Sequence, residues 1–318
     1  MVLVIGGVKI EEVPHDSRAL YHIAPHLKES GSLFAAALPK HLGPMGLLYV
    51  SQREFVACSP HDKNINIVAT DGCTTCITII FRHPTSGAVA FAHVEPVCVD
   101  GISAMLSRLQ DLSAGYFDQG PVHMHIYGSF SDNRGYGEEL LYSVLHYVHK
   151  EPYEIDLVAA CVGVVNTVQR GDIPWPIVYG VGINIKTGEI FPATVLDKGP
   201  DIPLRNARLI TGTHALLEVY DYVSGLLRIG PFHYQPIRSA EIMLQQPDEF
   251  LLQHLTSSPE VEAAYVVGEI KAAIKHVQDH PFPEITIFPD NRPRYYRKDE
   301  NGHWVFVRLD PFRFDHLR

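Results

Sequence analysis

The chain has 318 residues, of which 46% are hydrophobic and 19% are charged. This composition is typical of a folded protein with a sizeable core, and it excludes an intrinsically disordered chain. The formal net charge is −10, from 26 basic and 36 acidic residues, and the basic residues form no run that could neutralise phosphates. We therefore expect no nucleic-acid partner.

Five cysteines are scattered along the sequence, at positions 58, 73, 76, 98 and 161. An odd number of scattered cysteines in a chain of this length does not indicate a disulfide framework, and it favours a reducing compartment. The first residues lack the basic region of a signal peptide, and no apolar stretch approaches about 18 residues. We therefore expect a cytoplasmic or nuclear protein that does not span a membrane. We also expect a monomer.

The first half of the sequence predicts one helix followed by a sheet. Residues 14–42 mix His, Ser, Gly and Pro with short apolar pieces, which indicates one short helix in an irregular segment. From Gly46 onward, β-branched and aromatic runs alternate with turn residues, and this pattern predicts strands within residues 46–59, 64–70, 73–81 and 87–94. Helical spacing then predicts helices at 99–118, with Asp100 as a candidate cap, and at 135–149, on either side of a strand at 122–130.

The second half continues with strands and ends in a hairpin. Buried-type strands are predicted at 155–165, 176–185 and 189–196, and shorter ones at 215–220 and 226–232. Helices are predicted near 239–255 and 259–279, the second after a Ser258-Pro259 start signal, and a hairpin with an Asn-Gly turn at 294–309. We interpret residues 1–318 as a single α+β domain, with a core of about 43–212 and a C-terminal elaboration of about 213–318.

Cys73 and Cys76 form a C-x-x-C pattern, which in other proteins serves redox or metal chemistry. A redox pair normally stands where a strand gives way to a helix N-terminus that lowers the thiol pKa, but here a strand-like run follows. A structural zinc site needs a second pair at ligand spacing, and the nearby His83, His93 and Cys98 do not supply one. We therefore expect neither a metal nor a cofactor.

Nucleophilic chemistry is also open to Cys76, which ends a Thr-Thr-Cys run and is followed by His93 on the next predicted strand. A thiol is a useful nucleophile when a neighbouring base or cation helps to form its thiolate. Taken alone, a cysteine in such an apolar run is more often a buried core residue. The residues by themselves leave both interpretations open.

Five blocks of the sequence occur in an order that is also found in a known family. They are GPMGLLYVSQREFVACSP, DGCTTCITIIFRHPTSGA, GSFSDNR, VYGVGINIKTGEI and LRIGP. Together they resemble the protein N-terminal asparagine amidohydrolases of animals and plants, over roughly residues 43–310. The resemblance implies a hydrolase of linear amides that converts the side chain of an N-terminal asparagine of proteins to aspartate, and so feeds the N-degron pathway of protein degradation.

The resemblance also assigns roles to particular residues. In that family the cysteine that closes the Thr-Thr-Cys motif is the nucleophile, and this role falls on Cys76 and not on Cys73. The sequence resembles, more distantly, the bacterial chemotaxis-receptor glutamine deamidases, in which Cys, His and Thr act together, and their spacing leads to His93 and Thr70. This second resemblance implies a layered α-β-β sandwich, in which paired, mostly antiparallel sheets are flanked by helices.

The implied reaction is acyl transfer through a thioester. Cys76 would attack the amide carbon, ammonia would leave, and water would hydrolyse the thioester. His93 would carry the protons, with a pKa near the working pH, while Thr70 would orient the imidazole and backbone N–H groups near Cys76 would stabilise the oxyanion. Because residues three apart on a strand lie on opposite faces, we expect only one of Cys73 and Cys76 to lie beside the base.

An enzyme that selects a chain terminus must recognise a free α-ammonium group, which requires a carboxylate. Candidates are Asp132, Asp71 and Glu95, and the expected partners are proteins or peptides that begin with asparagine. Two alternatives stay open. One is a non-catalytic module that binds N-terminal residues, and the other is a cysteine amidase that acts on glutamine side chains.

Overall fold

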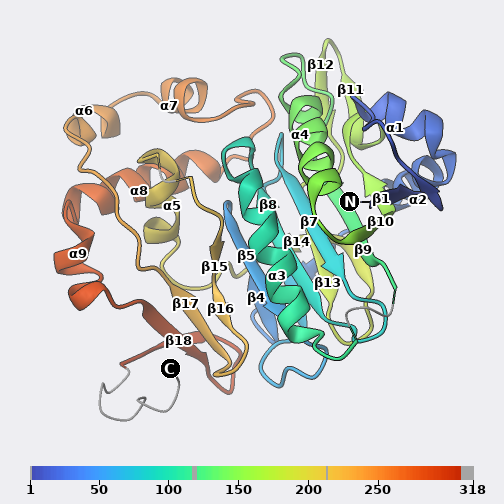
Figure 1. Ribbon diagram of the computed structural model, residues 1–318. Coiled ribbons are helices and arrows are strands. Elements are labelled where there is room, and N and C mark those ends of the chain that lie inside the picture. The colour runs from blue at the N-terminus through green and yellow to red at the C-terminus, as the bar shows by residue number, and fades with distance from the viewer. Residues whose placement is uncertain (1, 117–119, 213, 309–318) are drawn as a thin grey trace.

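The structure is a computed structural model that describes residues 2–116, 120–212 and 214–308. Its centre is a mixed eight-stranded sheet, which lies behind helices α3 (Ile102–Leu112) and α4 (Tyr136–Lys150) in the view of Figure 1. The strand order in this sheet is β15 (Leu217–Glu218), β5 (Glu54–Cys58), β8 (Val89–Val94), β7 (Ile77–Arg82), β9 (Val122–Gly128), β10 (Glu154–Cys161), β1 (Val2–Ile5) and β2 (Val8–Lys9).

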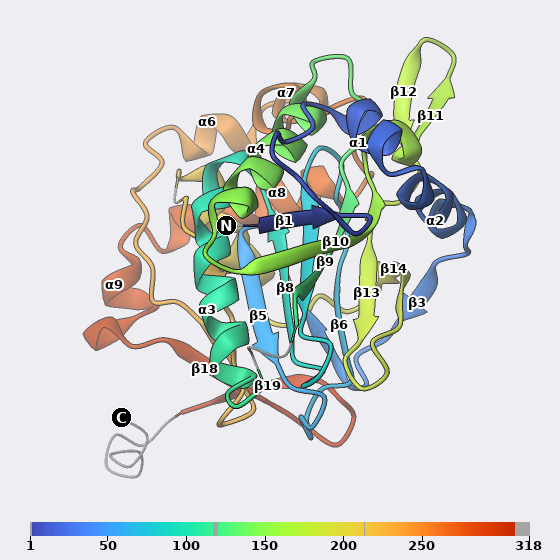
Figure 2. The same cartoon turned by 45° about the vertical axis from the view of Figure 1, so that its right-hand side comes forward.

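A second sheet packs behind the first. Its strand order is β3 (Lys40–Leu42), β14 (Ile190–Val195), β13 (Val181–Asn184), β6 (Ile67–Thr70) and β4 (Leu47–Tyr49). Figure 2 shows this five-stranded sheet on the side of the eight-stranded sheet that faces away from α3 (Ile102–Leu112). Since helices cover one face of the central sheet and a sheet covers the other, all six residues of β8 are buried.

The remaining elements flank these two sheets. The other helices are α1 (Ser17–Ile23), α2 (Pro25–Ala36), α4 (Tyr136–Lys150), α5 (Ile202–Ile210), α6 (Ala240–Leu244), α7 (Asp248–Leu255), α8 (Val266–Asp279) and α9 (Pro283–Thr286). Short 3-10 turns occupy Pro96–Gly101, Gly163–Asn166 and Pro289–Asn291. A two-stranded sheet pairs β11 (Thr167–Arg170) with β12 (Ile173–Pro176). A four-stranded sheet has the order β16 (Tyr220–Asp221), β17 (Leu226–Ile229), β18 (Arg294–Lys298) and β19 (Trp304–Val307).

The predicted fold class is confirmed. Helices α3 and α4 pack on the eight-stranded sheet through the apolar faces that their sequence spacing predicts, and most of the strand pairs are antiparallel. The hairpin of β13 and β14 and the hairpin of β18 and β19 also form as predicted. Among the described residues, no helix combines the length and apolar character needed to cross a bilayer. The division of the chain into a core and an elaboration stays a prediction.

Several local predictions were wrong. Residues 14–42 hold two helices and strand β3, because Asp16 caps α1 and Pro25 then starts a second helix. Gly101, and not Asp100, precedes α3, since Asp100 lies within a 3-10 turn. The hairpin β1–β2, the hairpin β11–β12 and helix α5 were not predicted. Residues 117–118 of one predicted helix and residue 309 of the predicted hairpin lie outside the described residues.

The helix predicted for 259–279 begins later, at Val266. Ser258 does not cap a helix there, since its hydroxyl donates a hydrogen bond of 3.2 Å to the side chain of Glu262. The predicted helix at 239–255 is divided into α6 and α7. Residues between α7 and α8 therefore form an irregular segment, which lies against the core (Figure 1).

Candidate active site

His93 and Thr70 meet between the two main sheets. Thr70 ends β6 of the five-stranded sheet, and His93 lies on β8 of the eight-stranded sheet. The Thr70 hydroxyl and the His93 Nδ1 are 2.8 Å apart, and both residues are almost completely buried. The hydrogen bond fixes the imidazole and joins the two layers, as the predicted orienting role of Thr70 requires.

Cys73 also contacts the imidazole. Its sulfur lies 3.5 Å from Nε2 and 3.6 Å from Nδ1 of His93, and 3.5 Å from the Thr78 hydroxyl. The expectation that Cys73 lies away from the base is therefore wrong. Strand alternation does not apply at this position, because β7 begins at Ile77 and Cys73 belongs to the loop before it.

Cys76 directly precedes β7 and opens onto a pocket. Ile77 pairs with Val94 across the sheet, so that Cys76 stands opposite Glu95 at the end of the ladder. The Cys76 sulfur is 4.0 Å from Glu95 Oε1 and 4.0 Å from Gln52 Nε2. No hydrogen bond joins this sulfur to His93 among the described residues.

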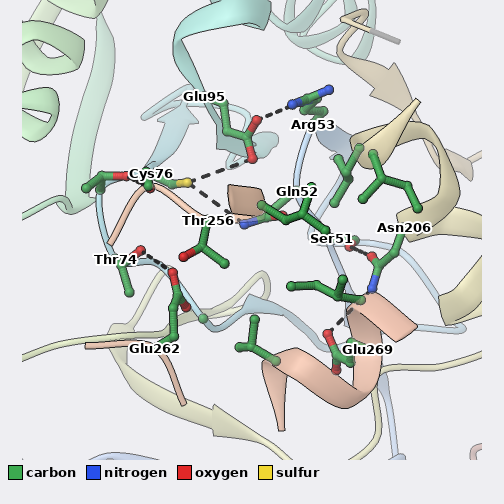
Figure 3. A pocket seen from close by; sticks show the side chains of 18 of the residues that line it. Ser51, Gln52, Arg53, Thr74, Cys76, Glu95, Asn206, Thr256, Glu262 and Glu269 are labelled. Carbon is green, nitrogen blue, oxygen red and sulfur yellow. Dashed lines mark hydrogen bonds and ion pairs between the residues drawn. The ribbon is translucent and has the colours of Figure 1, made fainter. Parts of the chain in front are cut away.

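The pocket has a volume of about 410 Å³ and is built from two parts of the chain (Figure 3). The core supplies Cys76, Glu95, Gln52 and their neighbours, while the opposite wall comes from residues 255–273. Hydrogen bonds hold the wall to the loop before Cys76, through Thr75 to Ser257 at 2.7 Å and Thr74 to Glu262 at 3.4 Å. Unlike Cys76, the buried Cys73 does not line this pocket.

The side chains of His93 and Cys76 are both neutral near pH 7. Burial lowers the pKa of His93 to about 3, so the expected pKa near the working pH is not found. Burial, followed by the charge of Glu95, raises the pKa of the Cys76 thiol well above its ordinary value. Near pH 7 the side chain of Cys76 is therefore a thiol and that of His93 a neutral imidazole.

The three predicted substrate-binding carboxylates lie in different surroundings. Asp71 and Glu95 line the pocket, but each already has a basic partner: Lys198 is 3.6 Å from Asp71, and Arg53 is 2.7 Å from Glu95. Asp132 does not line this pocket. Its carboxylate accepts hydrogen bonds from the backbone N–H groups of Arg134 and Gly137, at the start of α4.

Sequence reasoning missed the residues of the far wall. Glu262, Tyr265 and Glu269 all line the pocket, and Lys198 reaches Glu269 with an ion pair of 2.7 Å. No local pattern marks these residues, because a wall made by an irregular segment and the first turn of α8 has no period of its own. The only signal nearby, Ser258-Pro259, predicted a helix start that the structure does not contain.

Within the described residues, no group of three or more His, Cys, Asp and Glu side chains is placed to hold a metal ion. The five cysteines are all free thiols in buried positions.

Comparisons with known proteins give the family. The family model described as "Protein N-terminal asparagine amidohydrolase" matches residues 38–306. Proteins of that name from Sus scrofa and Homo sapiens are 32% and 31% identical to this chain over 96% of its length and 97% of theirs. The protein of that name from Arabidopsis thaliana is 27% identical over 81% of this chain and 80% of its own length. The chain therefore belongs to the protein N-terminal asparagine amidohydrolase family.

Proposed function

We propose that this protein hydrolyses the side-chain amide of an N-terminal asparagine to give aspartate and ammonia, with Cys76 as the nucleophile. The observation that carries the assignment is the position of its thiol, which lines a pocket that a peptide terminus can enter. The thiol of Cys73 is fully buried and packed against His93 and Thr78, so a substrate cannot reach it without movement of the core.

His93 serves as the proton carrier in this proposal. Diagonal neighbours on the same face of an antiparallel pair have Cα atoms about 7–8 Å apart, which is the relation of Cys76 to His93. Rotation of the short Cys76 side chain to another staggered position would turn its sulfur from Glu95 towards the imidazole. A neutral imidazole can accept the thiol proton, and Thr70 holds the ring through Nδ1.

The proposed reaction forms one carbon–sulfur bond and then breaks it. The Cys76 sulfur attacks the side-chain carbon of asparagine while its proton passes to His93, and the tetrahedral intermediate collapses as His93 returns the proton to the leaving ammonia. Water then attacks the thioester and gives one proton to His93, and the carbon–sulfur bond breaks as His93 returns that proton to the Cys76 sulfur, which releases the carboxylic acid.

Backbone donors are available for the oxyanion. Among the described residues, the N–H groups of Thr74, Thr75 and Cys76 donate no hydrogen bond, whereas the N–H of Cys73 donates to Tyr179 O at 2.8 Å. Free N–H groups beside a nucleophile are suited to an oxyanion, and one such donor is worth about 2.7–4 kcal/mol in other acyl-transfer enzymes. This availability supports the predicted oxyanion site around Cys76.

Two wider roles are part of the proposal. The substrates are proteins whose first residue is asparagine, and the enzyme acts on them in the cytoplasm or nucleus. The aspartate that forms would mark such a protein for the N-degron pathway, a role that rests on the family resemblance alone.

A direct experiment tests the nucleophile and the substrate together. The protein is incubated with peptides that begin with Asn, Gln or acetyl-Asn, and ammonia release and a mass gain of about one dalton are followed. We expect turnover of the Asn peptide that Cys76→Ser abolishes and Cys73→Ser largely retains. Turnover of the Gln peptide alone would favour the glutamine amidase, no turnover would favour a binding module, and a dead Cys73→Ser variant beside an active Cys76→Ser variant would overturn the assignment.

A further inference from the structure

Four carboxylates line the pocket, and three of them have basic partners. Lys198 pairs with Asp71 and Glu269, and Arg53 pairs with Glu95. These ion pairs offset two of the three charges, because Lys198 is shared between Asp71 and Glu269. A positively charged ligand at any of these three side chains would therefore share the carboxylate with a basic group that is already bound to it.

Glu262 is the exception. Its Oε1 accepts hydrogen bonds from the hydroxyls of Thr74 at 3.4 Å and Ser258 at 3.2 Å, and both of these donors are neutral. Within the part of the chain that the structure describes, it forms no ion pair, and its Oε2 makes no hydrogen bond. A partly buried carboxylate without a cation is costly unless a ligand supplies the missing charge.

The surroundings place this carboxylate beside the proposed nucleophile. Thr74, which donates to Glu262, stands two residues before Cys76 in the same loop (Figure 3). In an N-terminal asparagine only two carbon atoms separate the reacting amide carbon from the α-nitrogen. A residue that binds the ammonium must therefore share the pocket with the thiol, and Glu262 does.

We propose that the carboxylate of Glu262 binds the α-ammonium group of the substrate and so restricts the reaction to a chain terminus. The inference rests on the proposed function. An internal or acetylated asparagine has a neutral amide at this position, which would leave the carboxylate buried and unpaired in the complex. The predicted carboxylates Asp71 and Glu95 would instead keep their Lys198 and Arg53 partners.

The titration of Glu262 gives the proposal a pH signature. Burial raises its pKa to about 7, although the hydroxyls of Ser258 and Thr74 oppose the rise. The charge of Glu262 in turn acts on the thiol of Cys76 and the phenols of Tyr179 and Tyr265, whose pKa values burial, as the largest cause, raises above their ordinary ranges. None of them titrates between pH 5 and 7, so an acidic limb near pH 7 would report Glu262.

The test compares Glu262→Gln with Glu260→Gln, which removes one negative charge from an exposed position two residues away. With a peptide that begins with free Asn, Glu262→Gln should lower kcat/KM by about tenfold to a hundredfold, the range for loss of a hydrogen bond to a charged group. The loss should lie mainly in KM, and turnover of acetyl-Asn peptide should not fall. Glu260→Gln should match the wild type on both peptides.

The wild type supplies a second measurement if the variant folds poorly. Its kcat/KM for the free Asn peptide should fall as pH drops below about 7, because the protonated Glu262 no longer attracts an ammonium, while kcat stays level. A Glu262→Gln variant that keeps the wild-type preference for free over acetylated termini would overturn the inference, as would a pH-independent kcat/KM between pH 5 and 7. If the wild type releases no ammonia at all, the proposed function fails, and calorimetric binding of the two peptides still tests Glu262.

Discussion

The two walls of the pocket are built by different means. The core side lies at the ends of β7 and β8, where Cys76 and Glu95 directly adjoin the paired residues Ile77 and Val94, and where Thr70 fixes His93 from the second sheet. The far side is an irregular segment and the start of α8, held by hydroxyl contacts. A rigid sheet suits the groups that must keep their geometry during chemistry, whereas a separate wall can change selectivity without disturbing them.

Charge distinguishes the two sides as well. On the core side the carboxylates have basic partners, and the buried Glu54 is paired with Arg205 of α5 at 2.5 Å. Arg205 also donates to the carbonyls of Tyr49 and Lys198, so that α5 locks the turn that carries Gln52 and Arg53 into the pocket. On the far side, Glu262 has no basic partner among the described residues. In our proposal the sheets therefore carry the residues that react, and the far wall carries the residue that selects a free N-terminus.

The largest expected effect breaks the core side at His93. His93→Ala should lower kcat by about 10²–10⁴-fold, the usual contribution of general acid–base assistance, with little change in KM. Single-turnover kinetics on the Asn peptide measures the effect, and His83→Ala is the control, because His83 lies at the far end of the β7 hairpin. If His93→Ala keeps normal turnover and Glu95→Gln is crippled, the base is the carboxylate 4.0 Å from the thiol.

A second prediction breaks the joint between the two sides. Arg205→Met removes the main partner of Glu54, both of them nearly inaccessible to solvent, and should lower the free energy of unfolding by about 3–5 kcal/mol. Urea titration measures the loss. The double variant Arg205→Met/Glu54→Leu should be more stable than Arg205→Met, because no buried carboxylate is left unpaired.

Lys40→Met is the matched control for this prediction. The Lys40–Glu189 pair is as short, at 2.6 Å, but both side chains are about half exposed, so its loss should cost less than about 1 kcal/mol. Equal losses for Arg205→Met and Lys40→Met would show that α5 does not hold the turn through this ion pair.

The sequence predicted the core side better than the far side, and the reason is the length of the pattern. Helices α3 and α4 have apolar residues at helical spacing and bury one face, and strand β8 is apolar at most positions and buries both faces. Patterns of this length predict the elements from the sequence alone. The contact of Thr70 with His93 was predicted from the spacing of a resembling family, and the structure contains it.

Local reasoning failed where the chain is irregular. The contact of Cys73 with His93 arises in a loop, where strand alternation has no meaning. The hydrogen bond from Thr74 to Glu262 joins residues 188 positions apart, and contacts of that separation leave no trace in a single sequence. Helix α5 was missed for a related reason, since its buried Arg205 and Arg208 give its inner face a polar pattern.

The smallest expected effect is on the free energy of unfolding, and it tests whether Glu262 differs in charge from the paired carboxylates of the core side. The pKa of Glu262 is about 7 in the folded protein and 4.5 in an ordinary exposed position, with burial as the main cause. Between these two values the folded state binds the extra proton, so the free energy of unfolding falls as pH rises from about 4.5 to 7. At about 1.4 kcal/mol per pKa unit, the total is about 3.5 kcal/mol.

Glu262→Gln removes this proton and should therefore gain stability relative to the wild type as pH rises, by about 2.5 kcal/mol between pH 5 and pH 8. The quantity to measure is the difference in free energy of unfolding between variant and wild type, because every other titrating group cancels in that difference.

Glu260→Gln, at an exposed position, should give a difference that does not change with pH. Adding Asn peptide at pH 8 should stabilise the wild type more than Glu262→Gln, because the peptide ammonium supplies the charge that the wall lacks. If the stability difference between Glu262→Gln and the wild type is as independent of pH as that of Glu260→Gln, the far wall holds no unpaired charge. The two sides of the pocket would then differ in rigidity alone.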